Sequence, residues 1–473
     1  MEVSVTRRNG RNPKLRTACD RCYQLKERCE RTTTSVLCAR CERLGLDCAT
    51  IRPVRPVGRR VKHENQVSKL ASGKRRKLQH HQHDIDSIDA CLDNPEEKEL
   101  LQFLLGQTDS MDNYVVCPSF QAEQQHSLAA QLPTALPLLK DAYLACAITI
   151  KQLQSDNVAD TDANSSIRYI TKAMSALHSL STSCSENAIL CQTLGSMLAF
   201  SIYSVIGVGV PEICKYCLDT ANPSVETGTT ISRTNKGSWE SFLVLLETMD
   251  CLVHRQKPTV RIQTPASGVV DRHLGLCLPL MPYYYDLCVI NNSLAHSTDL
   301  AASALLQKQL NDIQSVVESW QPSNMDQLVG QFDSTEIAHL LAQAKVYRLG
   351  ALLVGHRLRY RLGEEDSQAA IWSKEIIMEL EMAYQVTKRC VRFVTLPFIV
   401  AAVEVRDKTS RLKTLKLVDD CVDQYAPTLK KATKKFLCNV WRERDSNFTG
   451  YWFDLVYKPC PVLDSFGKVH FGS

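Results

Sequence analysis

Six cysteines near the start of the chain constrain its fold more than any other feature. They follow the pattern Cys-x2-Cys-x6-Cys, then eight residues, then the same half-motif again, and they are Cys19, Cys22, Cys29, Cys38, Cys41 and Cys48. Zinc prefers four ligands at tetrahedral corners. A Cys-x2-Cys pair offers two thiolates from one turn, and a third cysteine returns six residues later. No histidine lies between residues 1 and 62, so the repeat predicts zinc sites built from these sulfur atoms.

Two complete sites require that two of the six sulfurs be shared. If Cys19 and Cys38, the first cysteine of each half, bridge the ions, each of two zinc ions has four thiolates and the arrangement follows the repeat. Unrelated reduced cysteines, or ordinary sites completed by histidine, are the alternatives, and the matched spacing argues against both. The segment has few large aliphatic residues, so zinc must supply much of its folding energy. We expect the segment to be unfolded without metal.

Charge is distributed unevenly along the chain. The net charge is +5, yet residues 1–80 hold 21 Lys and Arg against 7 Asp and Glu, whereas the remainder holds 35 against 44. Because lysine and arginine release counterions from phosphates, a basic arm on an acidic body predicts a polyanionic partner for the first 80 residues.

Two further observations bear on the cellular compartment. The start of the sequence lacks the apolar run of a secretion signal, so we expect the cysteines to be reduced thiols or metal ligands. The only long uncharged run, residues 188–210, contains Gln192 and three serines and ends at Pro211. These features favour a helix buried in a large core over a membrane span, and no membrane partner is predicted.

The segment after the cysteines, from residue 49 to about 94, is polar and contains prolines and glycines that predict a flexible linker. Arginines and a lysine between residues 52 and 62 could follow the DNA backbone. A second basic cluster is typical of a nuclear import signal, and it consists of Lys74, Arg75, Arg76 and Lys77. An ordinary solvated charge run is the alternative for both clusters.

Residues 60–90 show no heptad repeat of apolar side chains, so a homodimer has no support from a coiled coil. Binding of a single DNA site and pairing through the large domain both remain open. The acidic stretch from Asp84 to Glu97 has the composition of an activation segment. Alternatively, it leads into a helix with Asn94 as its cap and Pro95 at its first position.

Residues 95–473 are predicted to be predominantly helical. The clearest helix begins near Asp333, with Glu336 placed for a capping box, and is expected to end at Gly363. Acidic residues 364–366 would then lie in the first turn of the next helix. Other helices are predicted over 138–152, 167–181, 188–205, 239–253, 300–320, 370–387 and 429–444.

The cysteine segment resembles the fungal binuclear zinc cluster family of transcription factors, in all six cysteines and their spacings. The resemblance implies two bound zinc ions and a short helix after each Cys-x2-Cys, over residues 21–28 and 39–44 here, with Gly45 as a left-handed helix stop. It implies that Lys26 contacts guanine edges of a CGG-like triplet and that Arg28 is a second basic contact. Leu25 departs from the family, whose members commonly carry a basic residue there.

Lysine and arginine donate to guanine O6 and N7 or to phosphate, so Lys26 should govern sequence discrimination. The other basic residues are expected mainly to position the module, with a solvated surface charge as the alternative for each, and they are Arg16, Arg21, Arg28, Arg40 and Arg43.

The large region is similar to the helical regulatory domain that accompanies such clusters in one branch of the fungal family, especially over residues 350–353, 356–360 and 363–366. The resemblance implies an all-α domain that modulates activation or receives an effector. No phosphate loop, nucleophile elbow or His-Glu-x-x-His motif is present, and no enzyme activity is predicted. Cys214 and Cys217 lack a second pair nearby, and Tyr283–Tyr285 are expected to pack between helices.

The sequence therefore predicts a small zinc-stabilised two-helix cluster before a large all-α regulatory domain. The expected divisions are a basic disordered arm (1–15), the zinc cluster (16–50), a basic linker (51–94) and the regulatory domain (95–473). The predicted function is a nuclear, sequence-specific transcription factor for RNA polymerase II that works with the transcription machinery. The family resemblance extends this to a metabolic gene set, secondary metabolism included. A co-regulator that uses the cluster for protein contacts, and an enzyme docked to nucleic acid, are the alternatives.

Overall fold

The computed structural model describes residues 18–24, 26, 28–30, 37–46, 48–49, 94–107, 110–154, 160–180, 185–207, 209–221, 239–263, 269–296, 300–323 and 325–455. The chain divides into two compact units, Met1–Lys77 and Leu78–Ser473. The predicted basic arm, Arg16, residues 51–93 and the proposed import signal Lys74–Lys77 lie outside the described residues.

The described residues of the first unit contain two short helices, α1 (Asp20–Gln24) and α2 (Ala39–Arg43). Each begins directly after the first cysteine of a half-motif. The prediction that the first helix continues to Arg28 is wrong, because α1 ends at Gln24 and Lys26 has a φ of 55°. A residue in the left-handed region cannot continue a right-handed helix.

The second unit is helical, and within its described residues the only β-type pairing is a single bridge between Asp271 and Gly275. Its α-helices are α4 (Pro95–Gly106), α5 (Gln121–Gln154), α6 (Asp160–Ser179), α7 (Ser185–Val205), α8 (Val210–Ala221), α9 (Trp239–His254), α10 (Met281–His296), α11 (Leu300–Ser319), α12 (Met325–Gln331), α13 (Ser334–Arg359), α14 (Asp366–Thr387), α15 (Thr395–Val403), α16 (Lys408–Cys421) and α17 (Pro427–Asp445). Short 3₁₀ turns are η1 (Asp112–Tyr114), η2 (Pro118–Phe120), η3 (Leu278–Leu280) and η4 (Trp452–Leu455).

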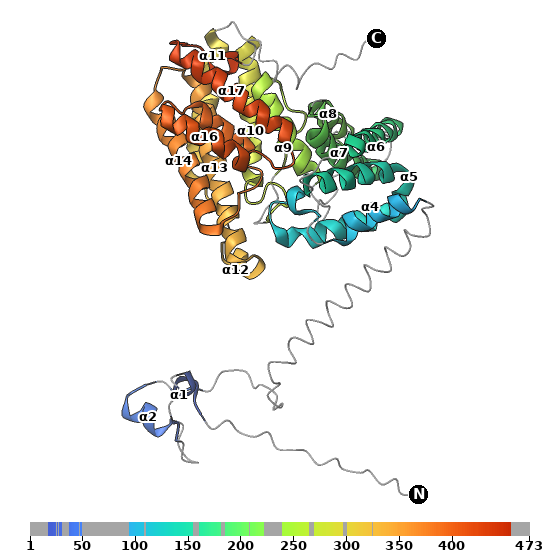
Figure 1. Ribbon diagram of the computed structural model, residues 1–473. Helices are drawn as coiled ribbons and strands as arrows, with labels where there is room; N and C mark the ends of the chain where they lie inside the picture. The colour runs from blue at the N-terminus through green and yellow to red at the C-terminus, as the bar shows by residue number, and fades with distance from the viewer. Residues whose placement is uncertain are drawn as a thin grey trace, which may run out of the picture. The chain divides into compact units, whose positions relative to one another are not determined.

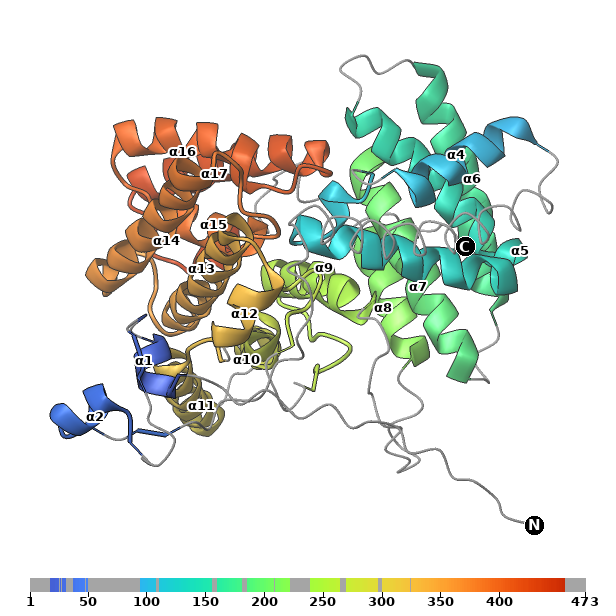
Figure 2. The ribbon, with the colours of Figure 1, turned by 90° about the horizontal axis from the view of Figure 1, so that it is seen from below.

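Two groups of helices share one apolar core in this unit (Figures 1 and 2). Helices α4–α8 lie together on one side and α13–α17 on the other, with α9 and α10 between them. Helix α7 packs against α5, α6, α8 and α9, and it also contacts α17, which joins the two groups. The described residues thus confirm the predicted all-α architecture for the large domain.

Two described helices, α7 over Ala188–Val205 and α13, are long and apolar enough to cross a membrane by length and composition alone. In each, 72% of the apolar window is buried inside the unit. Burial of this kind is typical of the core helices of large domains, as the sequence predicted for the uncharged run.

Capping residues in the sequence mark the starts of α4 and α13 correctly, but they do not mark the end of α13. Asn94 caps α4 with its side chain, and Asp333 and Glu336 form a complete capping box at the start of α13. The prediction that Gly363 ends α13 is wrong, because the helix stops at Arg359 and Tyr360 is extended. Only Asp366, of the three acidic residues after Gly363, lies in the first turn of α14.

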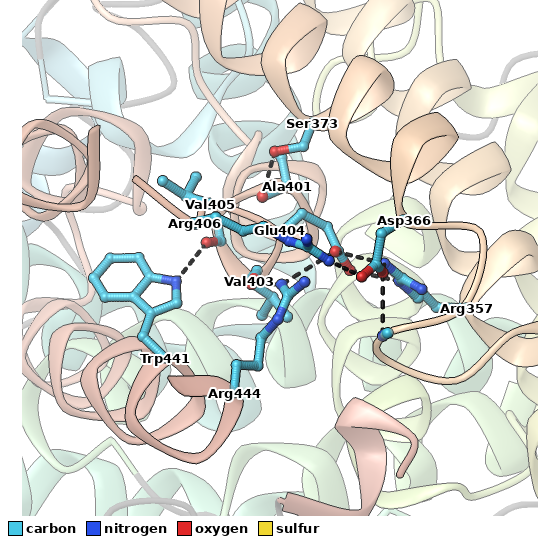
Figure 3. A network of polar contacts seen from close by, with 12 residues as sticks. Arg357, Asp366, Ser373, Ala401, Val403, Glu404, Val405, Arg406, Trp441 and Arg444 are labelled. Atoms are coloured by element: carbon cyan, nitrogen blue, oxygen red, sulfur yellow. Dashed lines mark hydrogen bonds and ion pairs between the residues drawn. The ribbon is translucent and has the colours of Figure 1, made fainter. Parts of the chain in front are cut away.

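A buried arginine explains why the chain turns where α13 ends (Figure 3). Arg357 is 1% exposed, and its guanidinium donates to both carboxylate oxygens of Glu404 at 2.8 Å and to the carbonyl oxygens of Arg361 and Glu364 at 3.0 Å. It also pairs with Asp366, at the start of α14. These contacts fix the turn between α13 and α14 against the end of α15.

Candidate zinc centre and DNA interface

Four cysteine sulfurs of the first unit converge at one point between α1 and α2. The Sγ atoms of Cys19, Cys22, Cys38 and Cys41 lie within 4.8 Å of one another, and all four side chains are buried. The Sγ of Cys19 lies 3.9 Å from that of Cys38 and 3.8 Å from that of Cys41, and the Sγ of Cys22 lies 3.8 Å from that of Cys38. With Zn–S bonds of about 2.3 Å, two ligands of one tetrahedral ion stand about 3.8 Å apart. The spacing therefore fits zinc.

Cys29 and Cys48, the third cysteine of each half, pack against this centre. The Sγ of Cys29 accepts the backbone N–H of Cys19, and the Sγ of Cys48 accepts that of Cys38, each at 3.3 Å. All six predicted cysteines are thus brought to one centre. Cys19 and Cys38 are in its middle, since each contacts sulfur atoms of the other half.

Backbone hydrogen bonds join the two halves with the same twofold symmetry. The N–H of Asp20 donates to the carbonyl of Ala49 at 2.9 Å, and the N–H of Ala39 donates to the carbonyl of Glu30 at 3.0 Å. These pairs are related by the nineteen-residue shift that relates the cysteines. The first residue of each helix is therefore held by the end of the other half-motif.

The protein environment favours the thiolate form at the two central cysteines. The backbone N–H of Cys41 lowers the pKa of the Cys38 thiol. Burial raises the pKa of Cys19, but hydrogen bonds from Cys22 and other cysteines lower it by more, so the net direction is downward. Burial and the neighbouring Cys19 sulfur raise the pKa of Cys22 to about 12. An N–H group that donates to a sulfur stabilises its thiolate form. Cys19 and Cys38 are therefore the sulfurs best suited to carry negative charge.

Lys26 and Gly45 are equivalent under the nineteen-residue shift, and both have left-handed backbones, with φ of 55° and 57°. The second half uses glycine at this position, as the sequence predicted for Gly45, whereas the first half uses an exposed lysine. Residues with side chains enter this region at a cost of about 1 kcal/mol or more. The first half thus holds a lysine at a position where its backbone conformation is unfavourable.

The described basic side chains around the centre differ in exposure. Arg21, Lys26 and Arg43 are exposed, and Arg40 is half-buried. Arg28 is 89% exposed and forms an ion pair with Glu30 at 3.0 Å. Sequence reasoning missed the contact with Glu30, although the residue's place directly after the third cysteine was a usable signal.

Other residues considered for chemistry serve packing in the second unit. Cys214 and Cys217 are fully buried on α8. Tyr284 is buried and donates its hydroxyl to the carbonyl of Tyr347 at 2.8 Å. His356 packs against the rings of Tyr360 and Trp372. Within the described residues, the four converging cysteines of the first unit form the single group with metal-binding geometry.

Comparison with known proteins agrees with this geometry. The model of the fungal Zn(2)-Cys(6) binuclear cluster domain matches residues 17–56, and the model of the fungal specific transcription factor domain matches residues 141–461. Neither describes an enzyme family. No curated protein and no solved structure matches the chain. A binuclear cluster domain binds two zinc ions, and the second match covers more than half of the sequence. The chain therefore belongs to the fungal-specific transcription factor family and carries a binuclear zinc cluster that holds two zinc ions.

Proposed function

We propose that this protein binds DNA at CGG-like triplets through its zinc cluster and thereby regulates transcription by RNA polymerase II in the nucleus. All six cysteines of the cluster are its metal ligands, and Cys19 and Cys38 each bridge the two ions. The observation that carries the proposal is the exposed basic surface of the first half-motif, held on a buried sulfur centre whose spacing fits zinc.

The distances between sulfur atoms of the two halves support the assignment of Cys19 and Cys38 as the bridging ligands. Cys22 lies at tetrahedral spacing from Cys38, and Cys41 lies at the same spacing from Cys19. Each zinc would therefore take three cysteines of its own half and the first cysteine of the other. The lowered pKa of Cys19 and Cys38 agrees with this, because a sulfur shared by two cations must be a thiolate.

A break in the twofold symmetry of the cluster supports the first half-motif as the half that contacts DNA bases. The second half has Gly45 where the first has Lys26, and Asp47 where the first has Arg28. A carboxylate would repel phosphate, so the second half does not repeat the contacts expected of Lys26 and Arg28, although Arg40 stands where the first half has Arg21. Lys26 is therefore assigned to base edges. Arg16, Arg21, Arg28, Arg40 and Arg43 are assigned to the DNA backbone.

The test replaces Lys26 by glycine in the full chain. Glycine accepts the left-handed backbone of this position without strain, so Lys26→Gly removes the ammonium group while keeping the fold. We expect discrimination between a CGG site and a scrambled site to fall by about 1 to 3 kcal/mol, measured by fluorescence anisotropy at fixed salt. Lys26→Ala keeps a side chain on the same left-handed backbone, as lysine does, and should show the same loss of discrimination.

Arg43→Gln serves as the matched control. It removes an exposed charge assigned to phosphate, so it should weaken binding to both DNA sites equally and lower the salt dependence. Unchanged discrimination in Lys26→Gly, with unchanged occupancy of target promoters, would contradict the proposal and favour a co-regulator that uses the cluster for protein contacts.

Nuclear import is assigned to Lys74, Arg75, Arg76 and Lys77. Replacement of all four by alanine should move a fluorescently tagged chain from the nucleus to the cytoplasm. An unchanged distribution would contradict the assignment. The regulated genes are proposed to be metabolic, secondary-metabolite genes included, and transcript profiling of a deletion strain tests this.

A further inference from the structure

Charge is distributed unevenly within the second unit. Residues 408–445, which span α16 and α17, hold ten Lys and Arg against five Asp and Glu, whereas the rest of the sequence after residue 80 holds 25 against 39. The net negative charge of the whole region conceals this local excess. Helices α16 and α17 therefore form a basic part of an otherwise acidic domain, and clustered positive charge attracts polyanions.

The two helices lie side by side at the edge of the unit (Figure 2). Arg411, near the start of α16, pairs with Asp445 at the end of α17, at 2.7 Å. Lys434 on α17 pairs with Asp419, near the end of α16, also at 2.7 Å. These ion pairs cross the seam between the helices and show that the helices are antiparallel. Exposed residues beside the seam therefore share one outer surface.

Five exposed cations on this surface have no carboxylate partner within the part of the chain that the structure describes. Lys431, Lys435 and Arg442 recur at spacings of four and seven residues, which places them on one face of α17. Lys408 and Lys416 stand about two turns apart on α16. Arg442 donates only to a neutral side-chain amide. We call these five residues the basic face.

The acidic residues between 408 and 445 do not neutralise the basic face. Asp419 and Asp445 already pair with cations across the seam. Asp423 is buried, and Asp420 is hydrogen-bonded to a nearby cysteine thiol. Glu443 is half-buried. The basic face therefore keeps a positive charge that an external anion can match.

The length of the basic face suits a DNA backbone. From Lys431 to Arg442, α17 rises about 16 Å, a distance over which one strand of a duplex presents about five phosphates. Lysine and arginine contact phosphates without reading the base sequence. Because both units belong to one chain, DNA held by the zinc cluster is present at a raised local concentration for the second unit. DNA is thereby favoured over a separate acidic protein.

We propose that the basic face binds the phosphate backbone of DNA beside the site that the zinc cluster recognises. This inference rests on the proposed recognition of DNA by the cluster. The contact adds affinity that is independent of base sequence, and it makes binding depend on the length of DNA that flanks the triplet.

The test compares a duplex of about 40 base pairs that carries the CGG site with one of about 12 that carries little more than the site. The variant of the full zinc-loaded chain combines Lys431→Gln, Lys435→Gln and Arg442→Gln. Each phosphate contact contributes about 0.9 to the slope of log K against log salt concentration. The slope on the long duplex should therefore become shallower by about 2 to 3, whereas that on the short duplex should stay unchanged.

The matched control combines Lys172→Gln, Lys308→Gln and Lys374→Gln. These lysines are also exposed, but they lie on α6, α11 and α14, away from the basic face. The control removes the same charge from the unit, so it should leave the salt slope on both duplexes unchanged.

Cys438 gives an independent readout of where the DNA lies. Among the described cysteines it alone is exposed, and it lies on α17 between Lys435 and Arg442. Its rate of alkylation by iodoacetamide, followed by mass spectrometry of the peptide, should fall several-fold on the long duplex and stay unchanged on the short one.

The outcomes separate this inference from the proposed function. If the wild-type chain binds the short duplex, an unaltered salt slope of the triple variant on the long duplex, or an unprotected Cys438, would overturn the inference alone. Failure of the wild-type chain to bind either duplex would contradict both. Protection of Cys438 by polyglutamate equal to that by the long duplex would favour an acidic protein partner and overturn the assignment to DNA.

Discussion

Arg357 shows at the scale of a single residue how a buried charge shapes this domain. Its guanidinium is fully enclosed and bonded to Glu404, Asp366 and two carbonyl oxygens (Figure 3). Removal of one partner of a buried ion pair typically costs about 3 to 5 kcal/mol when it leaves a charge uncompensated, whereas here Glu404 keeps its pair with Arg444 and Asp366 keeps its pair with Arg406. Arg357→Met should therefore lower the free energy of unfolding by about 3 kcal/mol, at the lower end of that range, measured by urea denaturation followed by circular dichroism.

Arg359→Met provides the control on the same helix. Arg359 is bonded to the neutral side-chain oxygens of Gln307, Asn311 and Gln314. Because its loss leaves no buried carboxylate, we expect a cost of about 1 kcal/mol. Equal effects of the two substitutions would show that the network around Arg357 does not stabilise the fold beyond ordinary hydrogen bonds.

Asp423 should make the stability of the second unit depend on pH. Burial raises its pKa to about 6, against smaller opposing effects of hydrogen bonds with Thr395 and Tyr425. Between the unfolded pKa of about 3.9 and the folded value, the native state binds more protons, so this residue's contribution to stability falls as pH rises through that window. Above it, the cost of the buried carboxylate reaches about 3 kcal/mol at most.

Asp423→Asn removes this titration, so the variant should gain stability relative to wild type as pH rises from 4 to 7, measured by thermal midpoints. The contribution of Asp445 to stability should change with pH in the opposite direction, because Arg411 lowers the pKa of Asp445 through a hydrogen bond and its charge. Asp445→Asn should lose stability relative to wild type at neutral pH and approach it only in acid. A constant difference between Asp423→Asn and wild type at every pH would contradict the assignment.

At the scale of the element, the start of α13 connects distant parts of the domain. Glu336 completes the capping box with Asp333, and its carboxylate also accepts the N–H of Ser119 at 2.8 Å and its hydroxyl at 2.7 Å. Asp333→Ala removes the cap alone and should cost about 1 kcal/mol of unfolding free energy. Glu336→Ala also breaks the contacts with Ser119 and should cost about 2 to 3 kcal/mol. Urea denaturation of the two variants checks the order, and a smaller effect of Glu336→Ala would contradict it.

The starts of α4 and α13 could be predicted from the sequence because their signals are local, whereas α5 begins at Gln121, well before the predicted residue 138. Asn94 with Pro95, and Asp333 with Glu336, satisfy N–H groups within one turn. The ends of helices were harder to predict from the sequence. The end of α1 depends on the left-handed backbone of Lys26, for which no glycine gives warning, and the end of α13 depends on Arg357 and on Glu404, 47 residues later. Long-range contacts of this kind have no local pattern.

At the scale of the whole molecule, the two units rest on different sources of stability. The described core of the first unit consists of its cysteines, with Leu46 packed against them, whereas the second has a large apolar core. Removal of zinc should therefore unfold the first unit alone. After chelation, limited proteolysis should cut between residues 18 and 49, while the thermal midpoint of the helical unit stays unchanged. A shifted midpoint would show that the second unit depends on the metal.

The candidate site was largely predictable because the spacing of its cysteines along the sequence indicates its chemistry. Six cysteines in a repeated pattern determine the metal and its ligand number, and the charge segregation indicates the polyanion. The reciprocal hydrogen bonds of Asp20 and Ala39 could not be predicted, because they depend on how the two halves face each other. The Arg28–Glu30 pair is local to one half and was missed.

Selection of bound sequences from a random pool of double-stranded DNA, by the purified full chain with and without a zinc chelator, tests the proposed DNA recognition most directly. The zinc-loaded protein should enrich CGG-like triplets, the number and spacing of which also report whether one or two chains bind. The chelated protein should enrich none. Enrichment that survives chelation, or no enrichment by the zinc-loaded protein, would contradict recognition of DNA by the zinc cluster.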